Sequence, residues 1–178
     1  AGLIAAIVMQ FPSQDSVLYR VLVFFMVLFV SVGLRRIMIP AWHLYVVSWW
    51  VLAGLSVLAL QASFAKLAFF SGAMSAIAAA LCVLHFIKPG ETKSIQMVFG
   101  VLIVGCSLCG LAYDQSEQIH QTVWFLPMIG IPISSIAFFL FQRKKYVAII
   151  SLGVVDLFVC AAVIWSLIAT PVPDDLWP

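Results

Sequence analysis

Long apolar segments alternate with short polar ones along this chain. Six of the apolar segments are about 20 residues long, which is the length of helix needed to cross a hydrocarbon core about 30 Å thick. Each backbone polar group in lipid must be satisfied within its own segment, so the segments should be helices. The pattern predicts an all-α, polytopic transmembrane helix bundle that forms one integral-membrane domain over residues 1–178. The predicted spans are residues 16–34, 41–60, 65–87, 95–113, 123–141 and 146–169.

The stretch from Ala1 to Phe11 is apolar but too short to span a membrane, and Pro12 follows it. No basic region precedes it, which disfavours a cleaved signal peptide. It therefore stays open whether this stretch belongs to a seventh span or lies at the membrane interface.

The composition agrees with a lipid environment. Hydrophobic residues make up 65% of the chain and charged residues 9%, whereas soluble domains have about 25% charged residues. This chain has too little polar surface to cover a globule in water, so the lipid bilayer is its expected surrounding. The net charge of +2 is too small to indicate nucleic-acid binding.

The charged residues between the segments predict an orientation. Basic residues follow the first segment (Arg35, Arg36), join the third to the fourth (88–93) and join the fifth to the sixth (143–145), whereas acidic residues gather at the other ends. Lysine and arginine collect on the cytoplasmic side of membrane proteins. We therefore expect a multi-pass inner (plasma) membrane protein with both termini on the non-cytoplasmic side.

A single carboxylate, Asp156, interrupts the last apolar segment near its middle. A charge at that depth costs several kcal/mol unless it is protonated, paired or hydrated. Gly153 and Cys160 share its helical face, and small residues favour helix packing, so Asp156 is predicted to point into the bundle. It would act there as a proton or cation site or a substrate ligand, or it would be a protonated structural acid bonded to a neighbour.

Arg20 and Lys66 are the nearest candidate cations to pair with Asp156. Both are predicted about one helical turn or less from the outer surface, so their depth differs from that of Asp156 by about 10–15 Å. Long basic side chains near span ends extend to the head groups, and this is what we expect of both.

The fifth segment contains two prolines and a glycine, Pro127, Gly130 and Pro132, followed by Ser134 and Ser135. Proline removes a backbone donor, and broken membrane helices often line cavities. The pattern predicts a break in the outer half, with Pro127, Gly130 and Pro132 as a hinge and the serines as binding or coupling residues beside Asp156. The alternative is a simple kink in which the serines satisfy the released carbonyls.

Small residues recur in two other segments. Cys106 and Cys109 form a C-x-x-C, but reactive pairs of this kind favour a helix N-terminus, whereas this pair lies near a C-terminus, so we expect a packing face with Gly100, Gly105 and Gly110. Repeats at a spacing of four in the third segment predict close helix contact within the bundle or with another chain; they are Ser71, Ser75 and Ala79, and Gly72, Ala76 and Ala80.

No cluster of chemistry-bearing residues indicates an enzyme. His43 and His85 lie at similar predicted depth, where a bridging haem is conceivable, but two interfacial histidines are the favoured interpretation. No group of cysteines and histidines resembles a zinc site, so no catalytic residue, metal or cofactor is predicted. Trp49 and Trp50, midway along the second segment, are expected to fill the core rather than to line a ligand cavity.

The stretch from Phe125 to Lys145, "FLPMIGIPISSIAFFLFQRKK", and the helix after it resemble a family of small bacterial inner-membrane proteins. That family is similar in outline to the PQ-loop sugar carriers and nicotinamide-riboside carriers. The resemblance rests on Leu126-Pro127-x-Ile129-Gly130 and the basic loop that follows. It implies a small-solute carrier, although this chain has no Pro-Gln pair and no seventh helix after Thr170.

Two functions are consistent with these features. The first is a small-solute or ion transporter, or a channel-like protein, that uses the intramembrane carboxylate. The second is a non-catalytic accessory subunit of a larger membrane complex, which self-associates or binds other subunits through the small-residue faces.

Overall fold

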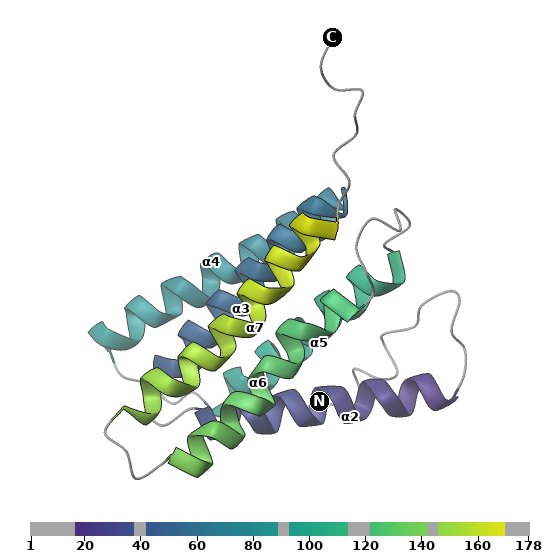
Figure 1. The fold of residues 1–178 in the computed structure, drawn as a ribbon. Coiled ribbons are helices and arrows are strands. Elements are labelled where there is room, and N and C mark those ends of the chain that lie inside the picture. Colours follow the sequence, from purple (N-terminus) through teal and green to yellow (C-terminus); the bar gives the residue numbers. More distant parts are fainter. Residues whose placement is uncertain (1–16, 38–41, 89–92, 114–121, 142–145, 170–178) are drawn as a thin grey trace.

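The computed structural model describes residues 17–37, 42–88, 93–113, 122–141 and 146–169 (Figure 1). Ala1–Phe11, the 114–121 loop and the basic turn at 143–145 lie outside the described residues. The predicted all-α fold is confirmed, and the largest shift in a predicted boundary is at the first segment, whose helix continues past Leu34 to Ile37. The helices are α2 (Val17–Ile37), α3 (Trp42–Gln61), α4 (Ala65–Ile87), α5 (Lys93–Tyr113), α6 (Thr122–Phe141) and α7 (Val147–Ala169).

Four of these helices, α3, α4, α6 and α7, are long and apolar enough to cross a membrane. The other two contain shorter apolar segments, Val23–Leu34 in α2 and Met97–Ala112 in α5. This set of helices is that of a polytopic membrane helix bundle.

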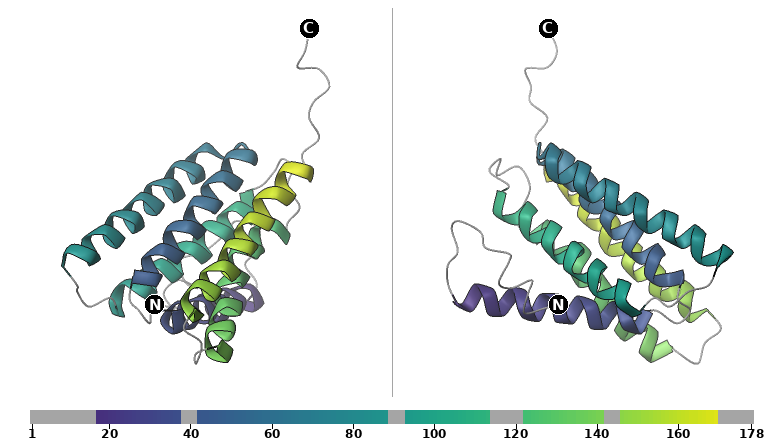
Figure 2. Two further views of the ribbon diagram at one scale, coloured as in Figure 1. Left: turned by 60° about the vertical axis from the view of Figure 1, so that its left-hand side comes forward. Right: turned by 180° about the vertical axis from the view of Figure 1, so that it is seen from behind.

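Helix α3 is the centre of the bundle and contacts each of the other five described helices. It packs most extensively against α4 on one side and also pairs with α7, while α6 packs against α7 and α2. Figures 1 and 2 show that α2 runs across one end of the bundle, at an angle to the other helices.

Glycine allows α3 and α7 to approach closely. A Cβ atom added at Gly54 would overlap the Val159 side chain, and both residues are buried. Close backbone approach at small residues is the usual basis of helix association in membranes, where lipid is as apolar as the helices themselves.

Two serine hydroxyls join α3 to α4. Ser56 Oγ donates to the carbonyl oxygen of Ala68 at 2.8 Å, and Ser75 Oγ donates to that of Trp49 at 2.9 Å. Two small-residue repeats are predicted in α4. The one with Ser71 and Ser75 is therefore confirmed as an internal contact. In the other repeat, Gly72 faces Ser56 of α3, whose Oγ atom would be 3.1 Å from an added Cβ, whereas Ala76 and Ala80 are exposed.

The C-x-x-C segment packs inside the bundle. Cys106 is buried and Cys109 is half-buried, and both thiols are free. A Cβ atom at the nearby Gly110 would overlap the ring of Trp124, which is buried on α6. These contacts agree with the predicted packing face.

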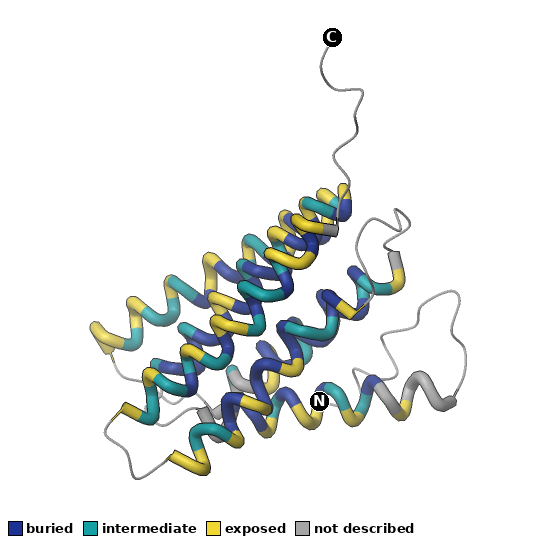
Figure 3. The backbone as a smooth tube through the Cα atoms, viewed as in Figure 1, coloured by how far each residue is buried: buried dark blue, intermediate teal, exposed yellow. Residues whose placement is uncertain are grey.

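The helices differ strongly in how much of their surface the chain itself covers. Of the apolar part of α3, 61% is buried inside the chain, against 22% for α7 and 28% for α4. Figure 3 shows exposed residues along the outer sides of α4 and α7. In a membrane these sides contact lipid or other proteins.

Candidate functional site

Asp156 lies in the middle of α7. The helix has 23 residues, and Asp156 is about 13 Å along its axis from Val147 at a rise of 1.5 Å per residue. Its carboxyl group is therefore far from both ends of the helix.

The Asp156 side chain is exposed on the outside of the bundle, so the prediction that it points inward is wrong. The inward face of α7 is instead formed by Ser151, Val155, Val159 and Ala162, all of which are buried. These residues recur at spacings of four, four and three, which places them on one side of a helix. Asp156 is on another side, together with the exposed Gly153.

Asp156 borders a groove that runs between α3 and α7, here called the α3/α7 groove. The name covers two neighbouring hollows of about 340 and 240 Å³, which have Trp50 in both linings. The lining is apolar except for the Asp156 carboxyl group, the Trp50 indole nitrogen and the Cys160 thiol. The residues are Val46, Val47, Trp50, Ala53, Gly54 and Val57 from α3, and Ile149, Leu152, Gly153, Val155, Asp156, Val159, Cys160, Val163 and Ile164 from α7.

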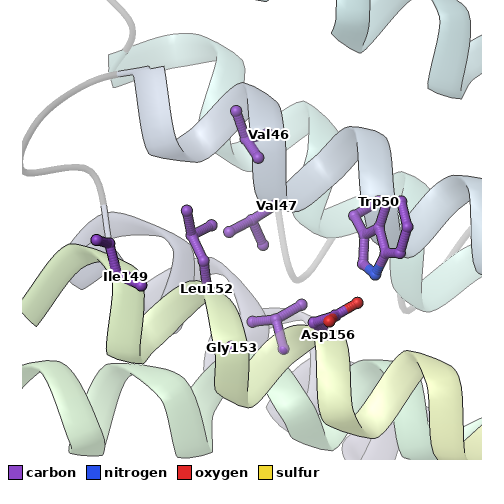
Figure 4. Close-up of a pocket in the computed structure, with 8 residues that line it drawn as sticks. Val46, Val47, Trp50, Ile149, Leu152, Gly153 and Asp156 are labelled. Atoms are coloured by element: carbon purple, nitrogen blue, oxygen red, sulfur yellow. The ribbon is translucent and has the colours of Figure 1, made fainter.

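Trp50 forms the wall opposite Asp156. Figure 4 shows the nitrogen-bearing edge of its indole ring turned toward the Asp156 carboxylate. Trp49 and Trp50 are 40% and 39% exposed, so the expectation that they fill the core is wrong. Trp50 instead places a hydrogen-bond donor on the surface of the groove.

Gly153 leaves the wall of the groove open. A Cβ atom added there would meet nothing within 4 Å, in contrast to Gly54, where it would overlap Val159. The small-residue face predicted around Asp156 therefore exists, but no described helix of this chain packs against Gly153.

The Asp156 carboxylate has one hydrogen-bond partner among the described residues, the Cys160 thiol one turn further on. The Sγ atom donates to Oδ1 at 3.5 Å, and a thiol is a weak donor. This contact does not compensate for a charge in a low-dielectric environment.

No lysine or arginine stands near the middle of a helix along this sequence. Lys66 is exposed at the start of α4, and the Arg20 side chain is outside the described part of the structure. Along the sequence all nine cations lie at helix ends or between helices; they are Arg20, Arg35, Arg36, Lys66, Lys88, Lys93, Arg143, Lys144 and Lys145.

Ser134 and Ser135 do not join Asp156 in one site. Ser134 Oγ donates to the Ile131 carbonyl oxygen at 2.6 Å, and Ser135 Oγ donates to the carbonyl oxygens of Gly33 at 3.0 Å and Ile131 at 3.1 Å. Both serines are buried, and Ser135 borders a separate groove of about 340 Å³ between α2 and α6. The Ser135 hydroxyl joins α6 to α2, whereas the Ser134 hydroxyl bonds within α6.

Helix α6 is continuous through Pro127 and Pro132, so the predicted break is not present. Both prolines are buried, and Gly130 faces Phe158 of α7, whose Cβ atom would be 2.9 Å from an added Cβ. Proline releases the carbonyl four residues earlier, here those of Val123 and Met128. The serines bond Ile131 instead, so the predicted repair of the released carbonyls by the serines is not seen either.

Ser135→Ala is expected to loosen the contact between α2 and α6, because it removes the hydroxyl group that bonds Gly33. Interhelical hydrogen bonds of this kind contribute about 0.6 kcal/mol on average and about 1.7 at most. The measurement is the free energy of unfolding in detergent. Ser134→Ala is the matched control, since that hydroxyl bonds within its own helix; an equal loss in both variants would contradict the assignment.

The two described histidines, His43 and His85, each lie against aromatic rings. His43 is buried with its ring 3.8 Å from that of Trp42, and so is not exposed to head groups as predicted. The His85 ring lies 5.9 Å from that of Tyr45 and 6.4 Å from that of Phe86. Among the described residues no three metal-ligating side chains lie together.

Comparisons of the chain with protein-family models, with curated proteins and with solved structures found no match. The functional evidence therefore comes from the α3/α7 groove. Chemically, the groove offers an acceptor, Asp156, and a donor, Trp50, within an apolar surface. Such a surface is chemically suited to a membrane-embedded group that supplies a hydrogen-bond donor or a positive charge.

Proposed function

We propose that this chain is a non-catalytic subunit of a larger membrane complex and that the α3/α7 groove is part of its assembly surface. The observation behind the proposal is the outward direction of Asp156, a mid-helix carboxyl group on the exposed side of α7. Ionisable side chains within membrane helices normally face the interior of a bundle. Asp156 meets that rule if another subunit covers α7.

The free energy of placing Asp156 in the membrane also favours assembly. An aspartate at the centre of a membrane helix costs about 2.5–3.5 kcal/mol on insertion scales. Covering the groove with a partner that donates a hydrogen bond removes part of this cost, whereas lipid chains cannot. Assembly would thus relieve an unfavourable feature of the isolated chain.

The test is extraction from the native membrane in mild detergent, followed by native mass analysis of the species that contain this chain. The proposal predicts a large species with other subunits in a fixed ratio. A homogeneous species made only of this chain would contradict it.

A second candidate is the transport of a small solute or ion, with Asp156 as the binding or coupling residue. The observation in its favour is the accessible carboxyl group at mid-depth in a groove, and the resemblance of Phe125–Lys145 to small carriers agrees with it. Pro127, Gly130 and Pro132 would then be the moving element. Asp156→Asn should abolish transport in proteoliposomes while the fold is retained, and unchanged transport would contradict this role.

We also propose the orientation expected from the basic turns, in an inner membrane with both termini on the non-cytoplasmic side. The support is the distribution of lysine and arginine. Reporter fusions in the 88–93 turn and after Pro178 should be active on opposite sides, and activity on one side would contradict the orientation.

A further inference from the structure

We infer that the α3/α7 groove receives a transmembrane helix of a different subunit, and that this helix carries a lysine or arginine near its middle, opposite Asp156. The inference rests on the proposed role as a subunit and adds the chemical nature of the partner. It follows from the shape of the groove and from its charge.

The shape of the groove fits a helix. Between Ile149 and Ile164 it extends about 22 Å along α7 at 1.5 Å per residue, which is most of a membrane span. The lining of α7 includes Ile149, Gly153, Asp156 and Cys160 at spacings of four, three and four. This spacing is that of the seam in a left-handed helix pair.

The wall formed by α3 repeats the pattern. Val46, Trp50, Ala53 and Val57 line the groove at spacings of four, three and four. A partner helix would therefore contact two parallel seams, and the open position at Gly153 lets its backbone approach α7 closely.

The Asp156 carboxyl group determines which kind of occupant fits the groove. Asp156 faces the groove, and its hydrogen-bond partner among the described residues is the Cys160 thiol. Along the sequence the chain's lysines and arginines stand at helix ends or between helices. A second copy of this chain would bring another carboxyl group, and residues 1–16 contain no lysine or arginine. A lipid acyl chain would fill the apolar part but offer Asp156 no donor. A basic side chain on a helix of another subunit supplies the hydrogen-bond donor and the positive charge that Asp156 requires. A second copy of this chain, residues 1–16 and a lipid chain do not supply them.

The test uses a defined probe. Two leucine-rich transmembrane peptides, identical except for one lysine or one leucine at the centre, are labelled, and their association with the purified full-length chain in lipid vesicles is measured by energy transfer. The lysine peptide should bind about tenfold more tightly than the leucine peptide, the scale of a polar interhelical contact. Asp156→Asn should reduce this preference for the lysine peptide, and Gly153→Leu should weaken the binding of both peptides.

The controls use the exposed face of α4. Ala76 is exposed near the middle of that helix, so Ala76→Leu should leave binding unchanged. In the Asp156→Asn background, Ala76→Asp should not restore the preference for the lysine peptide, because Ala76 does not line the α3/α7 groove. Circular dichroism and thermal unfolding verify that each variant is folded.

The results separate this inference from the proposed function. Equal binding of the two peptides, or restoration by Ala76→Asp, would overturn the inference. If native extraction nevertheless yields a complex of fixed composition, the subunit role holds and its partner binds elsewhere. If extraction yields only this chain, the subunit role is contradicted, and the inference that rests on it is contradicted too, whatever the peptide binding shows.

Discussion

Asp156→Leu is expected to make the isolated chain more stable and at the same time to abolish its assembly. On insertion scales the exchange of aspartate for leucine at the middle of a membrane helix is favourable by about 3 kcal/mol. Asp156 is exposed and its hydrogen-bond partner within the described residues is a thiol, so the chain itself loses little. The partner loses the acceptor that the groove provides.

Two measurements check this prediction. The free energy of unfolding of the purified variant in bicelles should rise, and native mass analysis of membrane extracts should show the chain without its partners. Leu157 is a matched position, 65% exposed on the same helix, and Leu157→Ala should leave assembly intact. A lower free energy of unfolding for Asp156→Leu would instead show a structural acid bonded within the chain.

The second large effect is expected at Gly54, where α3 and α7 are in close contact. Gly54→Ala places a Cβ atom where the Val159 side chain lies. Both residues are buried, so the helices must separate or Val159 must adopt a strained conformation. Overpacking of this kind costs about 1–3 kcal/mol, and the measurement is again the free energy of unfolding of the purified chain.

Gly153→Ala is the control for this substitution. It makes the same chemical change on α7 at a position where an added Cβ meets nothing within 4 Å. The purified chain should be as stable as the wild type, or slightly more so, because alanine favours helix. Equal destabilisation by the two substitutions would mean that helix–helix contact at Gly54 does not determine the stability.

The sequence predicts the helices well because their lengths and boundaries follow from local physics. A run of about 20 apolar residues in lipid must form a helix to satisfy its backbone, and charged or proline-containing turns end it. This is why the predicted segments coincide with α2 to α7, even in α6, where two prolines misleadingly indicate a break. Helix α6 is continuous through both prolines, and its Gly130 packs closely against Phe158 of α7.

The direction of Asp156 could not be predicted in the same way. In water an apolar face is a buried face, but in lipid the outside of a bundle is as apolar as its inside. Helix α7 has small residues on two sides, Gly153 and Cys160 on one and Ser151 and Ala162 on the other. Only the packing of Val155 and Val159 against the other helices shows which side is internal.

The groove could not be predicted from the sequence either. Trp50 and Asp156 are about a hundred residues apart, and no local pattern relates them. They line the same hollow because α3 and α7 pack side by side, with Gly54 against Val159.

The most direct test of the account is site-specific photo-cross-linking from the groove in the native membrane. A photoreactive side chain replaces Gly153 in one variant and Ala76 in another, and the adducts are identified by mass spectrometry. The account predicts that the Gly153 variant forms an adduct with a transmembrane helix of one other subunit, at a residue near a lysine or arginine, and that the Ala76 variant does not. Adducts with lipid alone from both positions would contradict it.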